Sequence, residues 1–122
     1  MIGYVTLGTN DLGRASQFYD ELLKLVGAGQ AFATDRLVAW ANDPAKPMLC
    51  VIKPFNGEQA TVGNGMMVSL QVDKPEIAQA LHAKALSLGG SDEGAPGERM
   101  PGFYAAYFRD LDGNKLCAFS RG

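Results

Sequence analysis

The side chains best suited to chemistry in this chain are two cysteines and one histidine. Cys50 and Cys117 lie far apart in the sequence, and His82 is the only imidazole among 122 residues. A single histidine excludes a two-histidine metal site within one chain. The cysteines have three functional interpretations: a thiol nucleophile, a redox pair or a soft-metal site. We favour the alternative that both are small buried side chains with free thiols, because no histidine is positioned to activate a thiolate.

Two other chemically suggestive features have simpler structural interpretations. His82 lies off the apolar stripe of its predicted helix, which favours a solvated or interface histidine. The run Asp110-Leu111-Asp112-Gly113-Asn114 is superficially similar to a calcium loop, but its glycine is misplaced and no glutamate follows at the required spacing. Asp-Gly between two apolar strands is instead a strong hairpin signal.

Composition indicates an ordinary globular domain. The chain has 11 basic and 13 acidic side chains, with 47% hydrophobic and 20% charged residues. A net charge of −2 gives no electrostatic footprint for nucleic acid. No stretch approaches the ~20 apolar residues that span a bilayer, and Asn10 and Asp11 interrupt any signal-peptide pattern. With two free thiols, we expect a cytoplasmic protein without nucleic-acid or membrane partners.

Hydrophobic spacing predicts strand, helix and strands, twice over. In the first half, apolar runs predict a helix from Asn10 or Asp11 to Gly27, and strands over 2–9, 31–34, 36–41 and 48–52. In the second half, a capping box at Asp73–Glu76 predicts a helix that ends at Gly89. Strands are predicted there over 66–72, 103–109 and 115–120. The segment Ser91–Gly102 is predicted as a Gly/Pro-rich loop, with or without a short edge strand.

This order indicates an internal repeat. Tyr4-Val5-Thr6-Leu7 aligns with Met67-Val68-Ser69-Leu70, and a helix follows each strand. Near the ends of the repeats, Leu49-Cys50-Val51 corresponds to Leu116-Cys117-Ala118. We therefore expect one domain over 1–122, built of a module over about 1–57, a linker over 58–64 and a module over about 65–122.

Several segments carry a family resemblance: the opening IGYVTL at 2–7, DLGRA at 11–15, KPFNG at 53–57 and, above all, RDLDGNK at 109–115. With these segments the chain resembles the vicinal oxygen chelate superfamily of glyoxalase I, bleomycin-resistance proteins, fosfomycin-resistance proteins and extradiol dioxygenases. The resemblance covers essentially the whole chain. It implies an α+β fold of two tandem βαβββ modules, whose curled mixed sheets enclose a small-molecule cavity with the helices outside. It also implies a homodimer.

Metal sites in this superfamily use four ligands, usually His or Glu, on the first and last strand of each module. The repeat alignment carries those positions over to Tyr4, Cys50, Met67 and Cys117. None of them supplies the imidazole or carboxylate that hard divalent cations require. We therefore expect no metal and no cofactor, and glyoxalase, dioxygenase and fosfomycin-transferase activities are disfavoured.

The last hairpin adds two candidates to the cavity. A two- or four-residue loop would place Asp110 opposite Lys115 and Phe108 opposite Cys117, so that Tyr104 and Phe108 share the face of Cys117. Trp40 points either into the cavity or toward the helix. The candidate ligand-binding residues are therefore Tyr4, Cys50, Met67, Tyr104, Phe108 and Cys117, with ordinary core as the alternative.

Three functions are compatible with these features. We favour a metal-independent binding protein that, as in the bleomycin-resistance branch, takes up a flat or aromatic molecule. The second is a lyase, isomerase or other enzyme that uses Tyr4 or a thiol in the same cavity. The third is an interaction subunit with little cavity. The sequence assigns neither the ligand nor a reaction.

Overall fold

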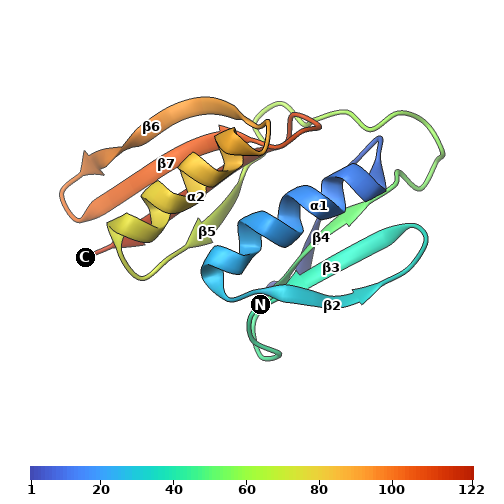
Figure 1. Cartoon of the computed structure of the whole chain (residues 1–122), viewed down its shortest axis with the longest axis horizontal. Helices are drawn as coiled ribbons and strands as arrows, with labels where there is room; N and C mark the ends of the chain where they lie inside the picture. Colours follow the sequence, from blue (N-terminus) through green and yellow to red (C-terminus); the bar gives the residue numbers. More distant parts are fainter. The chain divides into compact units, whose positions relative to one another are not determined.

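The chain consists of two compact units that share one topology. The computed structural model describes all 122 residues and divides them into Met1–Val62 and Gly63–Gly122. Each unit is a βαβββ module with one four-stranded mixed sheet and one α-helix, and in the first unit a short 3-10 helix, η1 (Lys24–Val26), follows the α-helix (Figure 1). The α+β fold class expected from the sequence is confirmed. No helix combines the length and the apolar character needed to cross a membrane.

The first unit has the strand order β1-β4-β3-β2. β1 runs parallel to β4, and the other neighbours are antiparallel. β4 is a continuous apolar run, as expected for a strand covered by the core. The strands are β1 (Tyr4–Gly8), β2 (Gly29–Ala33), β3 (Leu37–Ala41) and β4 (Met48–Ile52).

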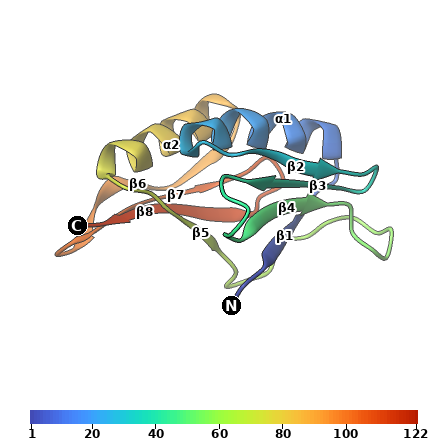
Figure 2. The ribbon, with the colours of Figure 1, turned by 90° about the horizontal axis from the view of Figure 1, so that it is seen from below.

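Helix α1 (Leu12–Leu23) lies on one face of this sheet (Figure 2). Asp11 caps it, because its carboxylate accepts a hydrogen bond from the Arg14 amide at 3.0 Å. Trp40 of β3 packs against the helix: its ring centroid lies 5.5 Å from that of Tyr19, and its indole N–H donates to Asp20 at 2.9 Å. Trp40 therefore faces the helix layer, which decides between the two directions left open by the sequence.

The second unit has the strand order β5-β8-β7-β6, again with its first and last strands parallel. Its strands are β5 (Val68–Gln71), β6 (Ser91–Met100), β7 (Phe103–Arg109) and β8 (Lys115–Arg121). The predicted loop over Ser91–Gly102 is instead the ten-residue edge strand β6. Gly94, Pro96 and Gly97 are tolerated there because the strand lies at an edge and its register with β7 shifts three times.

Helix α2 (Pro75–Ser87) begins one residue later than the capping box predicts. Its N-cap is Lys74, which makes no side-chain capping bond, and Asp73 lies outside the helix. Pro75 explains the difference, because a residue before proline is held extended, and Lys74 has φ −155° and ψ 158°. The helix is followed by Gly89, whose φ of 101° suits glycine.

His82 is buried on α2, so the prediction of a solvated or interface histidine is wrong. Its side is covered by β6, whose Asp92 carboxylate lies 2.9 Å from the ring nitrogen Nε2. The imidazole also meets the ring of Phe108 edge-on, with centroids 6.5 Å apart. The hydrogen bond with His82 lowers the pKa of Asp92. The burial of His82 was not predicted because residues 91–102 were expected to form a loop, with at most a short edge strand, rather than a long strand that covers this part of α2.

The β7–β8 hairpin forms as predicted, but its register is shifted by one residue. Arg109 pairs with Lys115, Phe108 with Leu116 and Tyr107 with Cys117. The turn therefore contains five residues, 110–114, rather than an even number. Asp110 is 5% exposed, and its Oδ1 accepts hydrogen bonds from the amides of Asp112 and Asn114, both at 2.9 Å. Drawn into the turn by these bonds, Asp110 cannot remain a pairing residue of β7.

We expect Asp110→Ala to lower the free energy of unfolding by about 2–3 kcal/mol, because it leaves buried N–H groups without an acceptor. Asp110→Asn keeps one acceptor oxygen for the two backbone amides and should lose less than half as much. Urea denaturation of both variants measures the difference. Equal losses in the two variants would show that the acceptor oxygen does not hold the turn.

Candidate functional site

The first sheet presents one face to α1 and another face away from it. Trp40 and its partner Leu49 point toward the helix, so alternation turns the neighbouring Cys50 the other way. We call the side chains that point away from α1 the Cys50 face; they include Tyr4, Thr6, Ala39, Ala41, Met48 and Cys50. The structure thus brings the candidates Tyr4 and Cys50 onto one face of neighbouring strands.

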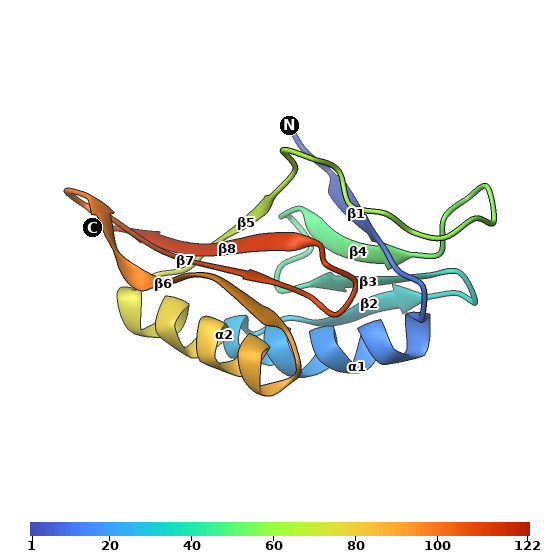
Figure 3. The same ribbon diagram turned by 90° about the horizontal axis from the view of Figure 1, so that it is seen from above.

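The second sheet is divided in the same way, with α2 on one face (Figure 3). We call the side chains that point away from α2 the Cys117 face; they include Ser69, Phe103, Tyr107, Lys115, Cys117 and Phe119. Met67 immediately precedes β5 and is 43% exposed, and continued alternation puts it on the side of Ser69. The candidates Met67 and Cys117 therefore belong to this face.

The two cysteines occupy equivalent positions, which confirms the repeat alignment. Cys50 of β4 pairs with Thr6 of β1, and Cys117 of β8 pairs with Ser69 of β5. Each thiol thus lies opposite a hydroxyl residue on the parallel neighbouring strand. The sequence alignment already matched Thr6 with Ser69, but their pairing with the cysteines needed the sheet register.

Both thiols are free and buried, each with 1% exposure. Burial raises the pKa of Cys50. Burial also raises the pKa of Cys117, although a hydrogen bond with Ser69 and the charges of Arg99 and Lys115 oppose part of that rise. The neutral thiol is therefore the favoured form of both side chains near pH 7, which matches small buried apolar residues better than activated nucleophiles.

Tyr104 and Phe108 do not lie on the Cys117 face. The five-residue turn changes the parity of β7, so both side chains point toward α2. Phe108 is fully buried against His82, and the Tyr104 hydroxyl accepts a hydrogen bond from Gln79 of α2 at 2.8 Å. The aromatic side chains that take their place beside Cys117 are Phe103, Tyr107 and Phe119.

The donor atoms at Tyr4, Cys50, Met67 and Cys117, the ligand positions expected from the repeat alignment, do not fit the usual metals of the superfamily that the sequence resembles. Those positions hold a phenol, a thiol, a thioether and a second thiol, and raised thiol pKa values oppose the thiolate that a soft metal binds. Cys50 pairs with Thr6 and Ala39, and Cys117 with Ser69 and Tyr107, so neither thiol has an imidazole or carboxylate partner across the sheet. Within neither unit do three His, Cys, Asp or Glu side chains gather around one point.

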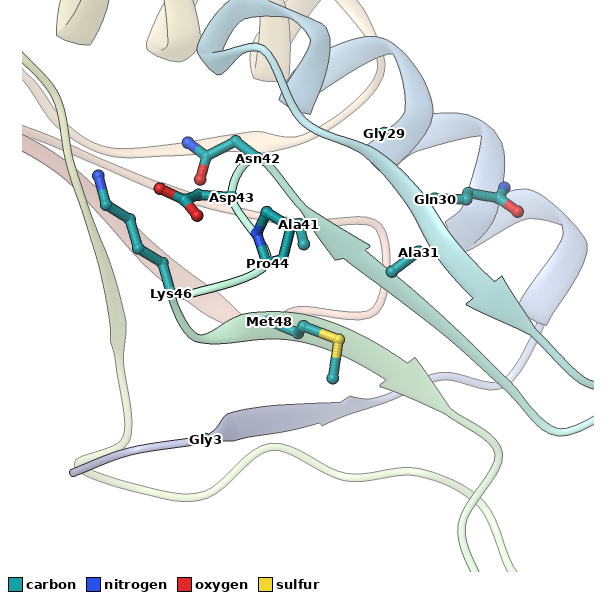
Figure 4. A pocket seen from close by; sticks show the side chains of 10 residues that line it. All are labelled: Gly3, Gly29, Gln30, Ala31, Ala41, Asn42, Asp43, Pro44, Lys46 and Met48. Atoms are coloured by element: carbon teal, nitrogen blue, oxygen red, sulfur yellow. The ribbon is translucent and has the colours of Figure 1, made fainter.

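A cleft of about 590 Å³ continues the Cys50 face at one end of the first sheet (Figure 4). Met48 and Ala41 connect it to that face, since Met48 is the partner of Tyr4. Most of its polar groups already have partners within the unit: Gln30 donates to Asp20 at 3.0 Å, and Asn42 donates to the Val26 carbonyl at 3.2 Å. The full lining is Gly3, Gly29, Gln30, Ala31, Ala41, Asn42, Asp43, Pro44, Lys46 and Met48. Sequence reasoning did not find this cleft, whose only local signal is the turn Asn42-Asp43-Pro44.

Comparison with known proteins identifies the fold and its relatives. A family model described as a glyoxalase-like domain matches residues 4–119. A glyoxalase/bleomycin resistance protein from Albidiferax ferrireducens T118 is 38% identical, with a TM-score of 0.92 over 100% of this chain and 99% of that one. Comparison with curated proteins gives no match.

Two more distant structures show the same fold. A lactoylglutathione lyase from Agrobacterium tumefaciens is 19% identical, with a TM-score of 0.70 over 98% of this chain and 92% of that one. TnmS3, an antibiotic binding protein from Streptomyces sp. CB03234, is 20% identical, with a TM-score of 0.70 over 100% of this chain and 96% of that one. At these identities the likeness concerns the fold alone.

We expect Cys50 and Cys117 to react slowly with a disulfide reagent in the native protein at pH 7. Their pKa values are raised, so the reactive thiolate is scarce at neutral pH, and the rate should increase as the pH rises. Absorbance kinetics with dithionitrobenzoate measure the rate, with the urea-unfolded chain as the fast control. Labelling of both native thiols within seconds would contradict the buried-thiol interpretation.

Proposed function

Because the chain belongs to the glyoxalase-like domain family, we propose that it is a metal-independent protein that binds a flat or aromatic small molecule. The observation that carries this proposal is that Tyr4, Cys50, Met67 and Cys117, the positions that the repeat alignment assigns to metal ligands of the superfamily, include no imidazole or carboxylate. A metal-dependent reaction would need imidazole or carboxylate ligands at these positions. Binding needs only a surface of suitable shape and polarity.

The two faces that point away from the helices supply such a surface. The Cys50 face combines small and apolar side chains with the exposed phenol of Tyr4, and it continues into the 590 Å³ cleft. The Cys117 face carries Phe103, Tyr107 and Phe119. Apolar and aromatic walls with a few polar groups are typical of small-molecule sites. The fold itself supports both binding and catalysis, since one structural neighbour is named an antibiotic binding protein and another a lactoylglutathione lyase.

A lyase or isomerase that uses Tyr4 or a thiol of the same faces is the alternative. Thiol catalysis requires a thiolate, and burial raises the pKa of both cysteines. Neither thiol pairs across the sheet with a histidine or carboxylate that would act as a base. These observations favour binding over thiol catalysis.

Native mass spectrometry of freshly purified protein tests the proposed function. We expect no stoichiometric divalent metal, even after incubation with nickel, manganese or zinc, and a retained organic ligand in part of the population. Ser69→Trp should abolish that retention, because Ser69 is exposed on the Cys117 face, whereas Ala83→Trp on the exposed side of α2 should not. One tightly held metal per chain, lost on substitution of both cysteines, would overturn metal independence.

We further propose that the chain forms a homodimer. β1 and β5 are edge strands of their sheets, so one side of each backbone lacks a strand partner within its own sheet. Large apolar side chains are exposed on or next to these strands: Ile2 before β1 and Tyr4, the first residue of β1, are 56% and 60% exposed, and Met66 before β5 is 62% exposed. A second copy of the chain would cover apolar groups that are otherwise in water.

We expect sedimentation at micromolar concentration to give about twice the 13.0 kDa chain mass. Ile2→Glu combined with Met66→Glu should shift the protein toward the monomer, because charges resist burial in an apolar interface. Leu86→Glu, at a 37% exposed position on α2, is the matched control and should leave the dimer intact. A wild-type mass of one chain would overturn the dimer.

A further inference from the structure

Positive charge gathers on the Cys117 face, although the whole chain has a net charge of −2. Alternation along β7 and β8 puts Arg109, Lys115 and Arg121 on this face. Arg99 of β6 joins them, since its guanidinium lies over the ring of Tyr107. Glu93 forms an ion pair with Arg109 and also interacts electrostatically with Lys115, so the four cations outnumber this carboxylate.

Two of these cations lie beside the aromatic ring of Tyr107. The Arg99 Cζ atom lies 5.3 Å from the centre of that ring, and the Lys115 Nζ atom lies 5.7 Å from it. Both distances are within the range of cation–π interactions. No ion pair joins Arg99 or Lys115 to a carboxylate, although Lys115 is close enough to Glu93 for its charge to lower the pKa of that carboxyl group. Two positive groups are thus held beside one aromatic ring, and Glu93, which interacts with Lys115, is already paired with Arg109.

Two glycines of β6 give Arg99 the room to lie there. A Cβ atom at Gly97 would come within 3.0 Å of its Nη1, and one at Gly94 would come within 2.8 Å of the Tyr107 ring. The Arg99 Nη2 also donates to the Ala95 carbonyl at 2.5 Å, which fixes the guanidinium along its own strand. Glycine weakens a strand interior, so its presence here is explained by the close approach of this side chain.

The positive charges of this face also act on Cys117. The charges of Arg99 and Lys115 both act to lower the pKa of Cys117, against the larger effect of burial. Ser69, opposite Cys117, adds an exposed hydroxyl that can donate a hydrogen bond. Beside them, Phe103 and Phe119 stack with their centroids 5.3 Å apart and their planes 22° apart. A flat apolar surface therefore adjoins a cluster of positive and hydrogen-bonding groups.

Resting on the proposed function, we propose that the Cys117 face binds organic anions, with a flat aromatic carboxylate as the ligand class. The carboxylate is bound by Lys115 and Arg99, and the ring lies against the aromatic side chains of β7 and β8. Charge-assisted hydrogen bonds to a carboxylate are stronger than those to a neutral group, so the face selects the anion over its neutral analogue. Cationic aromatic molecules are repelled by the same groups.

The matched probes 2-naphthoate and 2-naphthamide test this selection, because they share one ring system and differ in charge. We expect calorimetry to show that naphthoate binds about tenfold or more tightly than naphthamide, the difference that about 1.4 kcal/mol provides. High salt should weaken naphthoate binding and leave naphthamide binding unchanged. Amide chemical-shift changes should centre on Ser69 and Tyr107.

Charge-neutral variants assign the effect to residues. Lys115→Gln and Arg99→Gln should each remove most of the preference for naphthoate without changing the affinity for naphthamide. Gly97→Ala keeps every charge but displaces the Arg99 guanidinium, so it should weaken naphthoate binding alone. Lys74→Gln, which removes an exposed charge at the N-terminus of α2, should have no effect and is the control for net charge.

Each other outcome overturns the inference. Equal affinity for the two probes, or tighter binding of naphthamide, refutes anion selection while leaving the proposed binding function intact. Failure of both probes to bind refutes this ligand class, and the retained mass in native spectrometry then decides the proposed function separately. Tighter binding of a single-stranded oligonucleotide than of naphthoate would assign the positive face to nucleic acid instead.

Discussion

The buried carboxylate of Asp110 determines which side chains of the second sheet point toward α2 and which point away. Its oxygens hold the amides of Asp112 and Asn114 and the side-chain amide of Asn114, so the turn closes with five residues. An odd turn puts Tyr107 rather than Phe108 beside Cys117. The helix therefore receives Tyr104, Ala106 and Phe108 of β7, and the opposite face receives Tyr107 and Arg109. Without this turn, neither the core under α2 nor the charged face would have its present composition.

The two units show how one topology yields two different surfaces. In both, a thiol lies opposite a hydroxyl residue on the parallel strand. On the antiparallel side, however, Cys50 pairs with Ala39, whereas Cys117 pairs with Tyr107. Ala39 therefore leaves the Cys50 face without an aromatic ring beside the thiol. Tyr107 supplies such a ring on the Cys117 face, and Arg99 and Lys115 pack against it. The two units therefore share one backbone topology, and different residues at equivalent positions give each unit its own surface.

Most of the fold could be predicted from the sequence because local signals agreed with one another. The cap at Asp11, the apolar run of β4 and the hairpin at Asp112-Gly113 each have a strong local pattern. A short edge strand was left open for residues 91–102, but the ten-residue length of β6 was not predicted, because a strand with Gly94, Pro96 and Gly97 has no alternation to detect. His82 was misassigned in consequence, since its partner Asp92 belongs to that strand.

The candidate site was predicted only in part, for a related reason. Cys50 and Cys117 were correctly placed as equivalent residues, because the repeat aligns them directly. Tyr104 and Phe108 were placed on the wrong face, because an even turn length was assumed and one residue reverses a whole strand. Arg99 could not be assigned to the candidate site from the sequence, since its position depends on the path of β6 and on its contact with the ring of Tyr107.

The irregularity of β6 has a further consequence for aggregation. A long, flat and regular edge strand is a template on which other chains can add as β-structure. β6 is ten residues long, but its three register shifts and Pro96 interrupt any continuous row of donors and acceptors. The same irregular strand in which Gly94 and Gly97 leave room for Arg99 is therefore protected from uncontrolled strand addition along its ten residues.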